Sequence, residues 1–124
     1  MANHHHQGIG RLWRATLYLL AGIRAAWNNE AAFRQEVLLS VILAPAAFWL
    51  GSSTVERIML LGSCLIVLIT ELLNSAVEAA IDRISDDKHR LSGRAKDLGS
   101  AAVFISLWLA GITWGLIGYD RFFG

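Results

Sequence analysis

Cysteine and proline are almost absent from the sequence, which has one of each, Cys64 and Pro45. A lone cysteine cannot form a disulfide within the chain, so a small disulfide-stapled fold is excluded. Cys64 lies in an apolar run, where the ordinary role of a cysteine is that of a small buried side chain. With one proline and little loop-like composition, the sequence fits neither a disordered nor an all-β chain.

Charged residues are scarce as well. They make up 17% of the 124 residues, whereas 55% are hydrophobic, and the mean hydropathy is +0.46. A soluble domain of this length would not cover so much apolar surface with so few charges. The formal net charge is only +1, so the chain lacks the basic excess typical of nucleic-acid binding, and no nucleic acid partner is expected. The length predicts a single domain over residues 1–124.

Motifs for secretion and for soluble nucleotide-binding enzymes are missing. The apolar stretch Ala15–Ile23 is interrupted by Tyr18 and bounded by Arg14 and Arg24, which does not fit a secretory leader. The sequence has no GxxxxGKS or GxxxxGKT loop and no recognisable Ser/His/Asp or Cys/His set. The three histidines near the amino terminus lack spaced partner ligands, so residues 1–10 are expected to form a mobile polar arm.

Long uncharged stretches are present instead. Val37–Val55 and Leu98–Tyr119 each approach the roughly 20 residues that a helix needs to cross a bilayer. A third run, Ile58–Thr70, reaches that length only if its helix continues through Glu71. These runs predict an all-α, integral membrane protein with three transmembrane helices. The helices that contain the spans are expected over residues 30–50, 55–84 and 92–120. A soluble four-helix bundle is the alternative, but Leu98–Tyr119 lacks the polar face that it would require.

The segment before the first span has a different pattern. Over Arg11–Glu36, charges and aromatic residues alternate with alanine and leucine at helical spacing. This pattern predicts an amphipathic helix over residues 11–28 that lies on the membrane surface and turns near Asn28–Asn29 into the first span. Three thin spans enclose little space, so an oligomer is expected, with small residues such as Gly62 and Gly111 allowing close helix contact.

Basic residues set the expected orientation. Arginines 11, 14, 24 and 34 precede the first span, and five basic residues stand between the second and third, at positions 83, 88, 90, 94 and 96. The turn between the first two spans carries only Arg57. By the positive-inside rule the amino terminus and the loop of residues 83–96 are cytoplasmic, and the carboxyl terminus lies outside.

Polar residues interrupt the second span. Glu71, Asn74, Glu78 and Asp82 fall on one face of a helix that turns about 100° per residue. A charged carboxylate within a membrane is costly, so it is usually functional or paired. The alternative is that the span ends at Thr70 and that the acids lie on a wet continuation of the helix.

The residue types on this face suit phosphoryl transfer. Mg²⁺ takes one or two carboxylates and completes its shell with water and phosphate oxygens. Glu30, at the mouth of the first span, can meet Glu78 at the same depth, while a deeper carboxylate such as Glu71 can act as a general base. The loop over residues 85–100 mixes lysine, arginine, aspartate and glycine, which by itself is a weak signal for a phosphate site.

Three motifs resemble those of a known family. RAAWNNEAAFRQE (Arg24–Glu36), ELLNSAVEAAIDR (Glu71–Arg83) and LSGRAKDLGSAAV (Leu91–Val103) closely resemble the prokaryotic diacylglycerol kinases, in order, and the similarity extends from about Arg11 to the carboxyl end. The resemblance implies a homotrimer in the bacterial inner membrane, with active sites shared between subunits. The implied reaction transfers the γ-phosphate of MgATP to diacylglycerol and gives phosphatidate.

The resemblance also implies roles for individual residues. Glu71 matches the catalytic base, with Asn74 beside it, and Glu30 and Glu78 match the metal-binding glutamates, whereas Asp82 is expected only to mark the wet end of the helix. Nucleotide contacts are implied for Arg11, Tyr18, Glu30, Glu78, Asp87, Lys88, His89, Lys96 and Asp97. Contacts with the lipid substrate are implied for Arg11, Arg24, Arg34, Glu36, Trp49, Ser100 and Trp114. The stretches RLWRATLYLL and Asp86–Arg90 depart from the family pattern.

Other functions compete with this interpretation. An undecaprenol kinase of the same family would share the carboxylates and the kinase loop, so the site residues do not decide the lipid. A small proton-coupled transporter would use Glu71, but it has no need of Glu30, Glu78 and the SGRAKD motif. A non-catalytic scaffold gives no reason for the alignment of the acids on one face.

Overall fold

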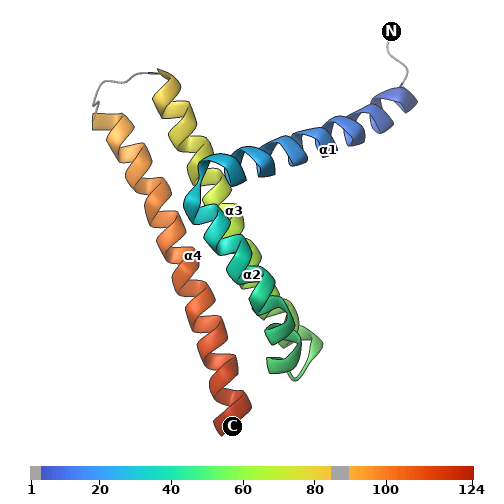
Figure 1. The fold of residues 1–124 in the computed structure, drawn as a ribbon, viewed down its shortest axis with the longest axis vertical. Coiled ribbons are helices and arrows are strands. Elements are labelled where there is room, and N and C mark those ends of the chain that lie inside the picture. The colour runs from blue at the N-terminus through green and yellow to red at the C-terminus, as the bar shows by residue number, and fades with distance from the viewer. Residues whose placement is uncertain (1–3, 85–89) are drawn as a thin grey trace.

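The computed structural model describes residues 4–84 and 90–124, with the backbone alone for residues 4–7. Within these ranges the chain forms four α-helices and no strand: α1 (His4–Asn29), α2 (Ala31–Leu50), α3 (Thr54–Ile84) and α4 (Arg90–Phe123). Figure 1 shows α2, α3 and α4 running alongside one another, while α1 leaves them at a steep angle. The prediction of an all-α fold is confirmed.

Helix α1 begins earlier than the sequence analysis predicts. The expected mobile arm over residues 1–10 is helical from His4 onward, and residues 4–10 contain no proline that would interrupt the helix. The glycines at positions 8 and 10 weaken a helix by only about 1 kcal/mol each relative to alanine. At its other end the predicted turn is confirmed: α1 stops at Asn29, Glu30 is extended, and α2 starts at Ala31.

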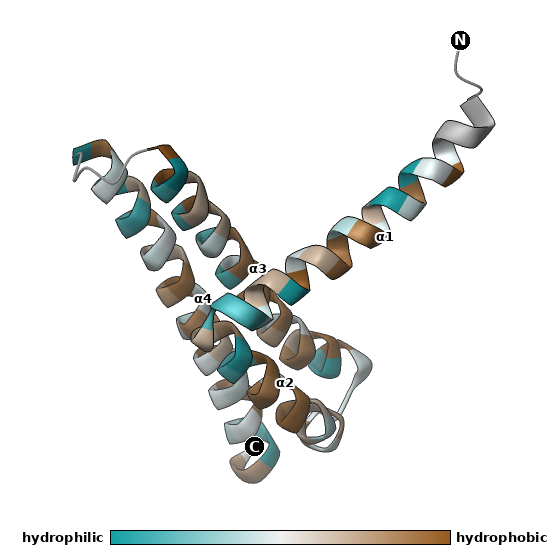
Figure 2. Ribbon diagram, turned by 45° about the horizontal axis from the view of Figure 1, so that its top comes forward, coloured by the Kyte–Doolittle hydropathy of each residue, from teal (hydrophilic) through white to brown (hydrophobic). Residues whose placement is uncertain are grey.

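Most α1 side chains are exposed, including large apolar ones such as Leu12, Trp13 and Leu17. Figure 2 shows hydrophilic and hydrophobic residues alternating along this helix. A helix that is polar on one side and presents leucine and tryptophan on the other is suited to the surface of a membrane rather than to water.

Helices α2, α3 and α4 are each long and apolar enough to cross a membrane. The 20 residues of α2 span about 30 Å, which matches the hydrocarbon core of a bilayer. Helices α3 and α4 have 31 and 34 residues and are about 46 and 51 Å long, so both must extend beyond that core. Their extra length projects past the start of α2, at the end where α3 finishes and α4 begins (Figure 1).

Helix α3 runs without a break through the polar residues. Its continuation past Thr70 to Ile84 gives the second apolar run the length that it lacks alone. The acids therefore belong to the same rigid element as the span, whichever part of it lies in lipid.

Helices α3 and α4 are antiparallel and pack closely along most of their length (Figure 1). Direct contacts between them occur at successive levels. From the end near residue 84 to the other end, these contacts are Asp82 with Lys96 at 2.7 Å, Asn74 with Gly99, Thr70 with Ser106 at 2.9 Å, and the Leu60 carbonyl with Trp114 Nε1 at 3.2 Å. The polar contacts fix the register of the two helices.

The small apolar core lies at the opposite end from Asp82 and Lys96. Ala47 and Leu50 of α2 pack there against Leu60 of α3, with Trp114 beside them. Leu60 and Ala47 are fully buried. This core joins α2 to the α3–α4 pair and leaves the outer faces of α2 and α4 exposed and apolar, as expected where lipid or another subunit covers them.

Candidate active site

An open cavity of about 620 Å³ lies between α1 and α3, near the start of α2. Tyr18 and Glu30 line it from one side, and Glu78 and Asp82 line it from α3. The structure thus brings together two predicted metal ligands, Glu30 and Glu78, and a predicted nucleotide contact, Tyr18. Asp82 belongs to this cavity as well, and does not merely mark the end of the helix.

The break between α1 and α2 positions Glu30. The Glu30 amide donates to the Ala26 carbonyl at 2.8 Å and closes the last turn of α1. Arg34 Nη1 donates to the Trp27 carbonyl at 2.6 Å. This bond joins the first turn of α2 to the last part of α1 and holds the angle between the helices. Arg34, for which a lipid contact is predicted, does not line the cavity.

Glu78 is held by its neighbour one turn earlier. Asn74 Nδ2 donates to Glu78 Oε1 at 3.3 Å, as the spacing of four residues on a helix allows. The other end of the same amide, Asn74 Oδ1, is buried and has no hydrogen-bond partner within the described part of the chain. Asn74 therefore orients Glu78, while its Oδ1 accepts no hydrogen bond within the described chain.

Glu71 is the buried member of the acidic face, at 7% exposure. Its carboxyl group shares a hydrogen bond with that of Glu36 on α2, and it lies within electrostatic reach of Glu30 and Glu78. Two carboxyl groups can share a hydrogen bond only when one carries a proton. Glu36 is predicted from the sequence to contact the lipid substrate, whereas its pairing with Glu71 is not predicted. The available signal is that Glu36 is the last charge before the uncharged stretch of α2.

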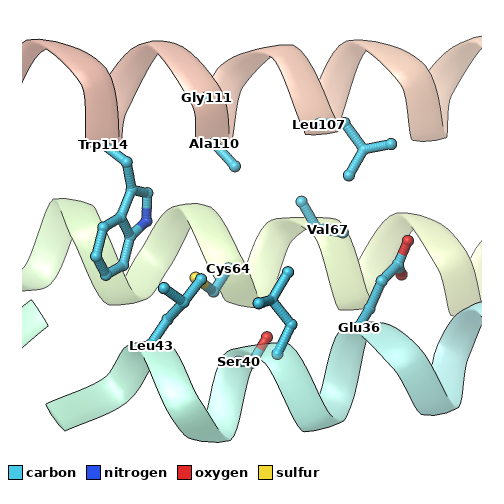
Figure 3. Close-up of a pocket in the computed structure, with 10 residues that line it drawn as sticks. Glu36, Ser40, Leu43, Cys64, Val67, Leu107, Ala110, Gly111 and Trp114 are labelled. Carbon is cyan, nitrogen blue, oxygen red and sulfur yellow. The ribbon is translucent and has the colours of Figure 1, made fainter. Parts of the chain in front are cut away.

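A second cavity, of about 280 Å³, extends from Glu36 between α2, α3 and α4. Figure 3 shows Glu36 at one end and the Trp114 ring toward the other, with aliphatic side chains between them. Its walls include Leu39, Leu43 and Val67. An elongated apolar space with a carboxyl group at one end has the character of a site for an amphipathic molecule.

Lys96 lies where α4 approaches the polar cavity. Its ammonium group forms a salt bridge with Asp82 at 2.7 Å. Lys96 precedes the uncharged stretch of α4 and lies outside it. The hydrogen bond to Asp82 is the main cause that raises the pKa of Lys96, and the charges of Asp82 and Glu78 act in the same direction. A cation at this edge of the cavity can neutralise a bound phosphate.

The carboxylates fit a magnesium ion that is shared with phosphate. Among the described side chains, residues 8–84 and 90–124, no group of three or more histidine, cysteine or acidic residues is arranged to hold a metal. Glu30 and Glu78 nevertheless face one cavity, and Mg²⁺ is commonly bound by one or two carboxylates plus water and phosphates. Glu30 and Glu78 are the residues that would hold it.

Several predicted contacts lie away from this centre. Arg11 lines a separate shallow depression on α1, and Arg24 is exposed on the same helix. Trp49 lies at the far end of α2. Its ring centroid is 5.8 Å from that of Phe122 and 5.2 Å from Arg121 Cζ. Asp97 and Ser100 are exposed on α4 near Lys96. Asp87, Lys88 and His89 lie outside the described residues.

The chain matches the sequence model of the family described as prokaryotic diacylglycerol kinase over residues 17–118. It is 51% identical over 108 residues to a diacylglycerol kinase of Haemophilus influenzae, covering 87% of this chain and 92% of that protein. For a diacylglycerol kinase of Pseudomonas aeruginosa the identity is 53% over 110 residues, covering 89% of both chains. For one of Escherichia coli K12 it is 49% over 125 residues, covering 98% and 99%. With its three apolar helices, the chain is a multi-pass membrane protein and belongs to the prokaryotic diacylglycerol kinase family.

Proposed function

We propose that the protein is an ATP-dependent lipid kinase that phosphorylates diacylglycerol to phosphatidate. The observation that carries the proposal is that Glu71 of α3 lies within electrostatic reach of glutamates that line two different cavities. The polar cavity holds Glu30 and Glu78, and the apolar cavity ends at Glu36, whose carboxyl group is bonded to Glu71. The family match and the names of the relatives support diacylglycerol as the lipid.

The polar cavity is the proposed site of the nucleotide. Glu30 and Glu78 would hold Mg²⁺, Tyr18 lines the wall, and Lys96 approaches from α4. A bound Mg²⁺ ion would neutralise charge on the polyphosphate and orient the γ-phosphate. Phosphoryl transfer depends mainly on positioning and charge stabilisation, and two carboxylates, one amide and one lysine of this chain can contribute to both.

Glu71 is the proposed general base. It takes the proton of the lipid hydroxyl while that oxygen bonds to the γ-phosphorus, the bond to the bridging oxygen breaks, and ADP leaves. The hydrogen bond between the Glu36 and Glu71 carboxyl groups holds Glu71 in place for this step. Glu36 Oε2 is buried and, apart from the neighbouring Glu71 carboxyl group, has no hydrogen-bond partner in the described chain.

The apolar cavity is the proposed place for part of the lipid. Its chemistry suits an acyl-glycerol, since a polar head can reach Glu36 while a chain lies along Leu39, Leu43 and Val67. Trp114 closes the other end and is held by its hydrogen bond to the Leu60 carbonyl. Undecaprenol is the alternative substrate, because it too is a long apolar alcohol.

The proposed assembly is a homotrimer in the bacterial inner membrane, with the active sites shared between subunits. The amino terminus faces the cytoplasm and the carboxyl terminus the periplasm, as the distribution of basic residues predicts. The exposed apolar faces and the buried unpaired acceptors on Glu36 and Asn74 support completion of each site by another subunit or by substrate.

The direct test is transfer of labelled γ-phosphate in detergent micelles, with diacylglycerol and undecaprenol supplied side by side and Mg²⁺ present or removed by a chelator. We expect Mg²⁺-dependent label in phosphatidate. Preferential labelling of undecaprenol would assign the alternative kinase activity. If neither lipid is labelled, the result would contradict a lipid kinase and favour the transporter interpretation.

Replacing Asp82 tests the part played by its salt bridge with Lys96. Asp82→Asn should raise the KM for MgATP about fivefold with little change in kcat, since an exposed pair of this kind contributes up to about 1 kcal/mol. Steady-state kinetics at varied MgATP measures the effect, and Asp82→Glu should restore most of it. Asp120→Asn, at the opposite end of α4, is the matched control. A lower KM in Asp82→Asn would mean instead that Asp82 competes with phosphate for Lys96.

A further inference from the structure

Gly99 lies directly against the side chain of Asn74, where α4 approaches α3. A Cβ atom at position 99 would overlap Asn74 Oδ1 and would lie 3.2 Å from Asn74 Cγ and 3.7 Å from Asn74 Cα. The space that a side chain would fill at position 99 is therefore taken by the amide of Asn74.

The other glycines in the same helix differ. At Gly93, Gly111 and Gly115 an added Cβ would meet no described atom within 4 Å, and at Gly118 it would meet only Leu50 Cδ2 at 3.9 Å. Glycine weakens a helix relative to alanine, so its presence within α4 is a cost unless it allows a close approach. Among these glycines, only Gly99 lies against a residue of the candidate site, Asn74.

The contact lies between two other fixed points. One end of α4 is tied to α3 by Lys96 and Asp82, and farther along Ser106 bonds to Thr70. These bonds limit how far α4 can move outward. A side chain at position 99 would therefore displace the amide of Asn74 rather than the whole helix. The amide is the component that can move, since its Oδ1 has no bond to hold it within the described chain.

Displacement of the Asn74 amide would affect the proposed metal ligand Glu78 through one hydrogen bond. Asn74 Nδ2 donates to Glu78 Oε1 at 3.3 Å, and Glu78 faces Glu30 across the polar cavity. Groups that orient a metal-binding carboxylate affect metal affinity or activity by about 10- to 100-fold when they are lost. The absence of a side chain at Gly99 thus helps to orient the Glu78 carboxylate, through Asn74.

We propose that Gly99 is a positioning residue, which seats the Asn74 amide against α4 so that Asn74 holds Glu78 in place for magnesium. The metal role of Glu78 rests on the proposed function, whereas the packing of Asn74 against Gly99 does not. Gly99 itself touches no substrate. Its effect passes from Asn74 to Glu78.

The first test is the Mg²⁺ dependence of phosphate transfer by Gly99→Ala. The Mg²⁺ concentration for half-maximal rate should rise about tenfold. Gly115→Ala is the matched control in the same helix and should leave the Mg²⁺ titration unchanged. An unchanged titration in Gly99→Ala, or an equal rise in Gly115→Ala, would overturn the proposal.

The second test measures thermal stability and does not depend on catalysis. Gly99→Ala should lower Tm in the wild-type background, because the new methyl group overlaps Asn74. In the Asn74→Ala background the same substitution should raise Tm, since the space is then empty and alanine is the better helix former. A fall in Tm of equal size in both backgrounds would show that Gly99 acts through another contact and would overturn the proposal. If the wild-type protein transferred no phosphate, the proposed function would fail. The opposite changes in Tm in the two backgrounds would still test the contact between Asn74 and Gly99.

Discussion

Replacement of Glu71 by glutamine is expected to lower the rate of phosphate transfer to diacylglycerol by about a thousandfold. Glutamine has nearly the same shape as glutamate and can still accept a hydrogen bond from Glu36, but it cannot take the proton of the lipid hydroxyl. Glu71 is buried against α2, so a group from solvent does not take its place as proton acceptor. The loss should therefore fall on kcat, and the KM for MgATP should change little.

The measurement is the initial rate of labelled phosphatidate formation at saturating MgATP and lipid. Glu56→Gln is a matched control, because Glu56 lies at the other end of the same helix and bonds only locally, to the amide and hydroxyl of Ser52. A thermal melt of Glu71→Gln should lie near that of the wild type, which separates lost chemistry from lost folding. A rate for Glu71→Gln within a few fold of wild type would exclude Glu71 as the base.

The helices of this protein can be read from its sequence because they follow from local patterns. The uncharged stretch of α2 has the length of a bilayer core, and the turn predicted near Asn28–Asn29 is found at Glu30. The spacing of Glu71, Asn74 and Glu78 depends on helix geometry alone, so their common face is also predictable. The start of α1 is not, since residues 4–10 combine glycines with no strong helix signal.

Contacts between helices cannot be read in the same way. Glu36 and Glu71 are 35 positions apart, and nothing local to either residue indicates that α2 and α3 place them together. Asp82 shares the helix face of Glu71 and Glu78 and is expected only to mark the wet end of the helix, yet the antiparallel register of α3 and α4 brings it to Lys96. The meeting of Asn74 and Gly99 has the same origin. Each of these pairs is a product of packing register, which a single sequence does not specify.

Loss of either proposed metal ligand should change the magnesium requirement more than any neighbouring substitution. Glu78→Ala and Glu30→Ala are each expected to raise the Mg²⁺ concentration for half-maximal rate by at least about a hundredfold, because loss of a group that only orients a ligand already costs 10- to 100-fold. The two carboxylates come from different elements and face one cavity, so neither can substitute for the other. A magnesium titration of labelled phosphate transfer measures both.

Glu78→Gln separates charge from hydrogen bonding at this site. Glutamine still offers an oxygen to Asn74 Nδ2, the bond that holds Glu78 in the wild type, but it removes the negative charge that a magnesium ion requires. If Glu78 binds the ion, Glu78→Gln should resemble Glu78→Ala. Near-normal magnesium dependence in Glu78→Gln would show that Glu78 serves only as an acceptor for Asn74.

The double variant Glu30→Ala/Glu78→Ala tests whether both residues act on one ion. Residues that act as a unit give non-additive losses, since the first substitution already removes most of what the pair contributes. The double variant should therefore be little worse than the poorer single variant. Losses that multiply would mean that Glu30 and Glu78 contribute independently. In that case the shared cavity would bring them close without joining them in one magnesium site.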